Sequence, residues 1–524
     1  MVLTQLTDGY DEDGHTRLVH SFFPAKLARI LLATGRPVFH RHQLLFVAQE
    51  ALRHCENRNE IPVSLPDVRG AGIMMLMASE LLASRASRRP ASSEELARRI
   101  SSILPDMETN GPLTYHRRMA RSLAMCTQFA DQLRGTKNYF DVRRLFHDGT
   151  EIELDTFYAL LFGCVSRFLN LKEIKASMNL APYAVGAEFF RKCTAITPNE
   201  LTRFFDYMSA DAASFAAEVL AKNPHRNEFT VFRNRPLFAD NGKYLPLDLS
   251  LLADKMESGV FWSVHNQVDS KKRDNFHQFW GEVFELYISW LIGASVDGKI
   301  NKFFARPRYL KRVGAEVCDA IVLSGTSAIL IECKGSTFTA KGKYGGDSKA
   351  LDAELRQKFV GTETSRKGVR QLVDAIKSLF AKDARDVIAD VDLQKVENVI
   401  PIILTRDDIG SAFNFSAYLN FHFQELIQGI GFTHSVSPLS ALSAADLESV
   451  SPYLVDMSLS DALLARIAAD KDLVFPFWNN ENAVLKNLQA RPSLLLNEQI
   501  ERLGEICIAR LRPPDDGPAL PANR

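Results

Sequence analysis

The sequence lacks the features that would place it outside a reducing aqueous compartment. Its 7 cysteines are an odd number among 524 residues, and no two of them have CxxC spacing. A disulfide framework and a structural zinc site are therefore not expected, and a cytoplasmic location is the simpler prediction. The N-terminal residues also lack the charged and then apolar pattern of a signal peptide.

Long apolar runs and an excess of one charge are absent too. The longest apolar runs, near residues 157–165 and 284–292, are short and interrupted, so no membrane partner is expected. The chain has 63 Lys and Arg residues and 63 Asp and Glu residues, so its formal net charge is zero. This balance argues against binding of nucleic acid through the overall charge of the protein. Residues 301–375, however, hold 14 Lys and Arg against 8 Asp and Glu. A local basic groove is compatible with that excess.

The composition is that of a globular protein, 46% hydrophobic and 24% charged, in a chain too long for one hydrophobic core. Residues 1–228 have apolar positions at three- and four-residue steps, which predicts a mostly helical domain of unknown role. Residues 229–270 form an expected strand and turn connector, with a tight turn at Asn241-Gly242. A mixed domain follows at 271–410, then a mainly helical extension at 411–512 and a disordered tail at 513–524.

The sequence of the mixed domain predicts the order of its helices and strands. A helix is expected at 276–292, followed by strands at 303–311, 316–323 and 328–334. A Gly/Lys-rich loop at 335–347 leads to helices at 349–360 and 368–379, and a buried strand lies at 399–405. This α-β-β-β-α-β order predicts an α/β domain within a protein that is α+β overall.

The second and third of these strands flank Ser324-Gly-Thr-Ser327. Glycine as the first central residue suits a two-residue type II′ turn, which pairs Ser324 with Ser327. Counting back from that pair places Asp319 opposite Glu332. Because side chains alternate between the faces of a strand, Lys334 is expected on the same face as both acids.

Two carboxylates at such a cross-strand position have Cβ atoms about 4.5–5.5 Å apart and repel each other. A divalent cation would remove that cost, and Mg²⁺ accepts one or two carboxylates beside waters and phosphate oxygens. Lys334, one pleat away, is placed to activate a water or to neutralise charge on phosphorus. The pattern therefore favours a metal-dependent phosphodiesterase site, although a solvated surface ion pair has the same residue types.

Asp319-x12-Glu332-x-Lys334, within that order of elements, resembles the PD-(D/E)xK nuclease superfamily and its restriction-endonuclease-like core. The resemblance covers residues 275–405, about a quarter of the chain, and the usual proline before the Asp is Cys318 here. It implies that Asp319 and Glu332 bind Mg²⁺ or Mn²⁺ with the backbone carbonyl of Cys333, and that Lys334 activates water.

The same resemblance implies further residues from the flanking helices. An additional acid is expected from the first helix, with Glu285 the first choice and Glu282 the second. A glutamine from the helix after the sheet, Gln371, would position water or phosphate. Ordinary solvation of a helix face explains each of these residues equally well. The basic residues expected to bind nucleic acid are Lys341, Lys343, Lys367 and Arg370.

The sequence thus predicts a Mg²⁺-dependent nuclease that hydrolyses DNA, with defence against foreign DNA as a role that such nucleases often have. The N-terminal helical region is expected to recognise a partner protein, and a homodimer is compatible with the sequence. Two alternatives stay open. One is a catalytically silent nucleic-acid-binding or scaffold protein that keeps the nuclease-like fold, and the other is a nuclease for structured RNA.

Overall fold

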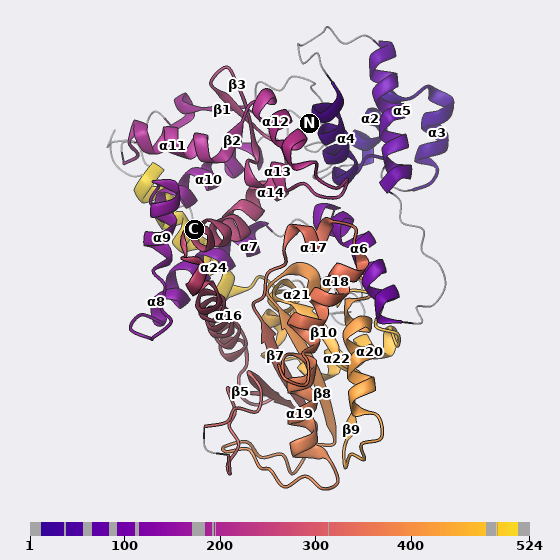
Figure 1. Ribbon diagram of the computed structural model, residues 1–524, viewed down its shortest axis with the longest axis vertical. Helices are drawn as coiled ribbons and strands as arrows, with labels where there is room; N and C mark the ends of the chain where they lie inside the picture. The colour runs from indigo at the N-terminus through magenta and orange to yellow at the C-terminus, as the bar shows by residue number, and fades with distance from the viewer. Residues whose placement is uncertain are drawn as a thin grey trace.

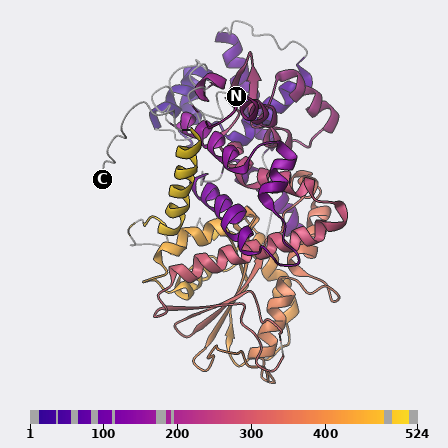
Figure 2. The same ribbon diagram turned by 90° about the vertical axis from the view of Figure 1, so that its left-hand side faces the viewer.

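The computed structural model describes residues 12–35, 38–55, 65–82, 92–110, 115–169, 184–190, 193, 195–312, 314–477, 489 and 491–511. Figure 1 shows a helical part, built largely from the first half of the chain, above a lower part that contains a β-sheet. The view in Figure 2, turned by 90°, shows the same two parts. The tail expected at 513–524 lies outside the described residues.

Every helix or strand described within the first 169 residues is a helix, as the apolar spacing predicts, and turns join these helices. Helices α2–α5 enclose a small core that includes Val19, Phe22, Phe39 and Met75. The helices are α2 (Glu12–Phe22), α3 (Ala25–Leu32), α4 (Arg41–His54), α5 (Leu65–Leu82), α6 (Ser93–Asn110), α7 (Tyr115–Leu123), a π-helical turn (Ala124–Phe129), α8 (Ala130–Gln132), α9 (Val142–Thr150) and α10 (Leu154–Leu169).

A small sheet completes the helical part, in the order β1-β4-β3-β2. Its strands are β1 (Val185–Gly186), β2 (Ser209–Ala210), β3 (Leu237–Asp240) and β4 (Lys243–Pro246), and the helices around it are α11 (Pro198–Met208), α12 (Ala212–Lys222), α13 (Thr230–Asn234), α14 (Leu249–Asp254) and α15 (Val260–Gln267). The predicted turn joins β3 to β4, with φ of 47° at Asn241 and 73° at Gly242, as a type I′ turn requires. These strands pair with β1 and β2, so the segment expected as a connector belongs to the helical part.

The lower part contains a larger sheet in the order β10-β8-β7-β6-β5, with β9 on β8. β5, β6 and β7 are antiparallel neighbours, whereas β7, β8 and β10 run parallel. The elements in chain order are α16 (Arg273–Ser295), β5 (Asn301–Ala305), β6 (Ala320–Ser324), β7 (Ser327–Lys334), α17 (Ala340–Tyr344), α18 (Ser348–Leu355), α19 (Val369–Phe380) and β8 (Asn398–Thr405). The predicted α-β-β-β-α-β order is present, and the α+β class is confirmed.

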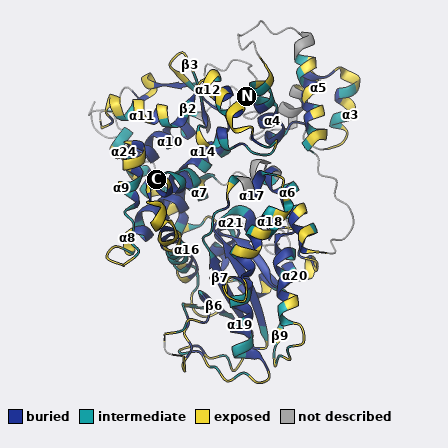
Figure 3. Cartoon of the chain, viewed as in Figure 1, coloured by how far each residue is buried: buried dark blue, intermediate teal, exposed yellow. Residues whose placement is uncertain are grey.

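Helices cover both faces of this sheet, and Figure 3 draws its central strands as buried. On one face Phe284 and Ile288 of α16 share a core with Ile329 and Ile331 of β7. On the other face Leu372 and Ile376 of α19 share a core with Leu330. The alternation of β7 side chains between these two cores determines which face receives Glu332 and Lys334.

Several element boundaries differ from the sequence prediction, and the second strand, for example, begins at Ala320 instead of residue 316. The first strand ends at Ala305 instead of residue 311, because Arg306 has a positive φ of 46° and Pro307 follows it. The 335–347 segment is not wholly a loop, since it contains α17 and buries Phe338 and Tyr344.

The C-terminal residues return to both parts of the molecule. β10 extends the larger sheet, and α24 packs against α7 and α10 of the helical part. The elements are α20 (Phe415–Ile427), β9 (Ser435–Val436), β10 (Ser440–Ser443), α21 (Ala444–Val450), α22 (Leu459–Ala469) and α24 (Leu494–Leu511). None of the helices in the described part of the chain is both long and apolar enough to span a bilayer.

Candidate active site

The β6–β7 hairpin has the predicted register. Ser324 pairs with Ser327 and Ala320 pairs with Ile331. Gly325, at the first central position of the turn, has a φ of 59°, which glycine adopts without strain. Asp319, one residue before β6, is therefore placed opposite Glu332.

The acids and the lysine meet at the carboxyl end of β7. Lys334 Nζ lies 2.6 Å from Glu332 Oε1 in an ion pair. Asp319 Oδ2 accepts a hydrogen bond of 2.6 Å from the backbone amide of Cys333. Glu332 is 1% exposed, whereas Asp319 and Lys334 are half-buried, so solvent reaches one side of the group.

Helix α19 brings Gln371 to this group. Gln371 Oε1 accepts hydrogen bonds from Lys334 Nζ at 3.0 Å and from the backbone amide of Gly368 at 2.7 Å. Gly368 has a φ of 49°, and a Cβ at this position would collide with the backbone carbonyl of Phe359. This glycine therefore lets the start of α19 lie directly against the Phe359 backbone.

Helix α16 supplies Glu285 from the other side of the sheet edge. Its Oε2 lies 2.7 Å from Arg306 Nη2 in an ion pair, and the backbone amide of Arg306 donates to the carbonyl of Asp319 at 2.8 Å. Glu282, one turn earlier on α16, is half-buried and its charge also acts on Arg306. Of the two acids, Glu285 is the one whose charge is felt by Asp319 and Glu332.

Burial and repulsion between neighbouring carboxylates raise the pKa values of the acids of this site. Burial, followed by the charge of Asp319, raises the pKa of Glu332 and that of Glu285 to about 7 each. Burial also raises the pKa of Asp319. For Lys334, burial favours the neutral amine, but the charges of Glu332 and Asp319 outweigh it and raise its pKa.

The oxygen atoms of this site are of the kind that bind a hard divalent cation such as Mg²⁺. Asp319 and Glu332 offer carboxylate oxygens, and the excess of negative charge that raises their pKa values is what a cation would neutralise. The Cys333 amide faces Asp319, and the carbonyl of the same residue points to that side of the strand. Among the described residues, however, no group of three or more His, Cys, Asp or Glu side chains is arranged to hold a metal ion. The ammonium of Lys334 is the cation in contact with Glu332.

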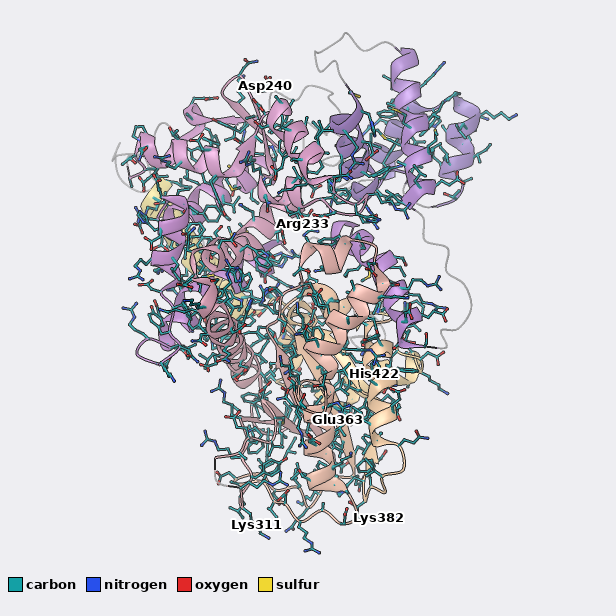
Figure 4. The ribbon with its side chains drawn as sticks, viewed as in Figure 1. Arg233, Asp240, Lys311, Glu363, Lys382 and His422 are labelled. Carbon is teal, nitrogen blue, oxygen red and sulfur yellow. The ribbon has the colours of Figure 1, made fainter. Side chains whose placement is uncertain are left out.

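The four basic residues expected to bind nucleic acid are not gathered in one place. Lys343, on α17, is buried and its Nζ lies 2.8 Å from Asp407 Oδ1. Lys367 is exposed just before α19. Arg370 lines a small cavity of 290 Å³ beside Glu363, which Figure 4 labels. The side chain of Lys341 lies outside the described residues. Arg370 is thus on the helix that carries Gln371 and Lys367 lies just before it, whereas Lys343 lines a different cavity.

Two arginines of this region were not among the site residues that the sequence predicts. Arg306 pairs with Glu285 and has a strained backbone, a combination that only the fold brings together. Arg406 follows β8 directly, and its backbone amide donates to the carbonyl of Lys334 at 3.1 Å. A basic residue at the carboxyl end of a buried strand was the signal available in the sequence for Arg406.

Comparison of the chain with protein-family models, with curated proteins and with solved structures finds no match.

Proposed function

We propose that this protein is a Mg²⁺- or Mn²⁺-dependent nuclease that hydrolyses phosphodiester bonds of DNA. The observation that carries the proposal is the convergence of Asp319, Glu332 and Lys334 at one end of β7, with Gln371 in contact with the lysine. Four chain segments far apart in sequence supply this group once Glu285 of α16 is included. A group of acids with raised pKa values and one open side is typical of a functional site.

The roles follow from the contacts. Asp319 and Glu332, with the Cys333 carbonyl, would hold the cation. A bound divalent cation polarises a phosphoryl oxygen and lowers the pKa of a water. Gln371 holds the Lys334 ammonium toward the acids, so that Lys334 can position a water or stabilise charge on phosphorus. Glu285 and Arg306 hold Asp319 from the α16 side.

Defence against foreign DNA is the biological role that this chemistry would suit. DNA as the substrate rests on the resemblance to PD-(D/E)xK nucleases, which the carboxylate geometry supports. The helical part would carry recognition of a partner protein or of a second copy of the chain.

One observation favours a second candidate, a catalytically silent nucleic-acid-binding protein that keeps this fold. The ion pair of 2.6 Å between Lys334 and Glu332 satisfies both groups without a metal, and no three-ligand cluster is formed by the described side chains. Such a protein would keep the fold and bind nucleic acid, but it would have no affinity for Mn²⁺ at Asp319.

Metal-dependent cleavage separates the two candidates. Supercoiled plasmid, single-stranded DNA and a structured RNA are each incubated with the full chain and Mn²⁺ or Mg²⁺. We expect DNA cleavage by the wild type and a loss of at least about 100-fold in Lys334→Ala and Asp319→Asn, since general acid–base and electrostatic groups contribute about 10²–10⁴-fold. Lys302→Ala, an exposed lysine on β5, is the matched control and should cleave like the wild type.

Full activity in Lys334→Ala would contradict the assigned site. Cleavage of the RNA alone would select the structured-RNA alternative. Absence of cleavage together with retention of DNA, and no Mn²⁺ binding to the wild type by calorimetry, would select the silent alternative.

A further inference from the structure

A cavity of 680 Å³ lies between the helical part and the lower part. Figure 4 labels Arg233, one of its lining residues, where the two parts meet. Its walls come from α7, α13 and α15 above, and from the segment after β7 and the residues after β8 below. None of the acids of the candidate active site lines it, so this is a separate site.

Arg406 lines this cavity and differs from the other charged residues there in being buried with an unbonded guanidinium Nε. It is 5% exposed, and its guanidinium has no hydrogen bond or ion pair with any described residue. Its only close partner is the ring of Phe261, whose centroid is 5.1 Å from Cζ. Burying a charge without a partner costs several kcal/mol. An anion in the cavity would remove this cost.

Four of the acids that line the cavity, Asp206 and Glu218 aside, are paired with other cations as follows. Asp407 contacts Lys343 at 2.8 Å, Asp254 contacts Arg233 at 3.5 Å, and Asp408 contacts Arg118. Glu257 contacts Arg121 at 2.9 Å. Glu257 and Asp407 attract Arg406 from a distance but do not bond to it, so its guanidinium is available to a ligand in the cavity.

Other groups in the cavity suit a ligand larger than a simple anion. Thr230 Oγ1 is buried without a hydrogen-bond partner and lines the cavity. Trp262 and Tyr344 add aromatic surface. The volume lies within the range of about 300–1,000 Å³ that is usual for small-molecule sites.

We propose that this cavity binds a nucleoside phosphate, with the phosphate on the Arg406 guanidinium and the base against the aromatic side chains. Arginine binds phosphate through parallel N–H donors, and it is less strongly hydrated than lysine, which suits a buried site. Aromatic rings offer a nucleobase a stacking surface.

The cavity is connected to the candidate active site through the backbone. The Arg406 amide donates to the Lys334 carbonyl, and the wall formed by residues 337–340 continues the chain from the end of β7. The nucleoside phosphate bound in the cavity can therefore be of two kinds. It is either a free nucleotide that acts as an effector, or the terminal nucleotide of a DNA strand that is bound at Asp319 and Glu332. Both present the same phosphate chemistry.

Calorimetry on the full chain tests the proposal with three probes: AMP, a 5′-phosphorylated trinucleotide, and adenosine. We expect the wild type to bind AMP or the trinucleotide and not adenosine, with at least tenfold weaker binding in Arg406→Gln and a smaller loss in Thr230→Val. Arg466→Gln, a matched buried arginine away from the cavity, should bind like the wild type. Binding of AMP identifies the free nucleotide as the source, whereas binding of the trinucleotide alone identifies a strand end.

Equal binding by Arg406→Gln and the wild type would overturn the proposal, as would binding of adenosine equal to that of AMP or no binding of any probe. Should Arg406→Gln fail to fold, Arg406→Lys replaces it: this variant keeps the charge but loses the paired donors, so it should bind AMP or the trinucleotide more weakly than the wild type, and equal binding would overturn the proposal. Lys334→Ala should keep nucleotide binding, so failure of the proposed nuclease activity would be seen separately.

Discussion

Two buried clusters in this molecule have the same composition, two carboxylates and one cation, but differ in how the cation is used. Arg121 bonds to both of its acids: Nε and Nη2 contact Glu257 at 2.9 and 3.1 Å, and Nη1 contacts Glu448 at 2.7 Å. Lys334 contacts Glu332 alone, and Asp319 takes a backbone amide instead. Only in the first cluster does the cation bond to both of the acids.

The pKa values differ between one acid of each cluster, Glu257 and Glu332, whereas burial raises the pKa of Glu448 as it does that of Glu332. Burial raises the pKa of Glu257, but Arg121 and its hydrogen bonds outweigh burial and lower it overall. At Glu332 burial and Asp319 prevail over Lys334, and the pKa rises to about 7. Under the proposed function, Asp319, whose described contact is a backbone amide, would be available to a cation, whereas both acids of the Arg121 cluster contact Arg121. The two clusters therefore differ in the number of bonds that the cation makes and not in the number of charges.

Removing Arg121 should have the largest effect on stability. Arg121→Met leaves Glu257 and Glu448 buried without a counter-charge, and breaking a buried pair in this way costs about 3–5 kcal/mol. Urea unfolding measures the change. Arg144→Met, at an exposed position of α9, is the control and should change stability by less than about 0.5 kcal/mol. An equal effect of the two substitutions would remove the distinction between the Arg121 cluster and a surface charge.

Cation affinity at the second cluster should depend on pH near neutrality. Glu332 and Glu285 have pKa values of about 7, raised from the ordinary value, so protons compete with a metal below pH 7. Lowering the pH from 7 to 6 should weaken Mn²⁺ binding about fivefold if one proton is displaced, because a carboxyl with a pKa of about 7 is already half-protonated at pH 7. Calorimetry at several pH values measures this, and affinity that is constant from pH 6 to 8 would contradict the raised pKa values.

In the metal-free protein the same raised pKa values make folding stability fall as the pH rises. The folded chain holds protons on these carboxylates that the unfolded chain has already released. Their ionisation therefore costs stability, and this cost grows from about pH 4.3, the ordinary value for Glu, to about pH 7. It is fully present above pH 7, where Mn²⁺ should raise the midpoint of thermal unfolding most.

Gln371 should have the smallest effect. Gln371→Leu removes its hydrogen bonds to Lys334 and Gly368, each worth about 0.5–1.5 kcal/mol, but leaves Lys334 paired with Glu332. DNA cleavage should fall about three- to tenfold, with Gln424→Leu on α20, an exposed glutamine, as the control. A loss as large as that of Lys334→Ala would mean that Gln371 contacts the reacting groups directly.

The sequence by itself determined the order of elements in the lower part and the register of the β6–β7 hairpin. These depend on local signals, the alternation of apolar residues and a glycine at a two-residue turn, so Asp319 opposite Glu332 could be counted from the turn. Glu285 and Gln371 could be chosen only by resemblance, because their positions depend on how α16 and α19 pack on the sheet.

Only the tertiary structure decided the rest. The pairing of Arg306 with Glu285, the burial of Lys343 against Asp407, and the cavity around Arg406 join segments far apart in the chain. A charged residue has the same letter in a sequence whether it is solvated, paired or isolated in a cavity. Its energy depends on neighbours that folding supplies, and for that reason the bonds at Lys334, Arg121 and Arg406 could not be read from the residues alone.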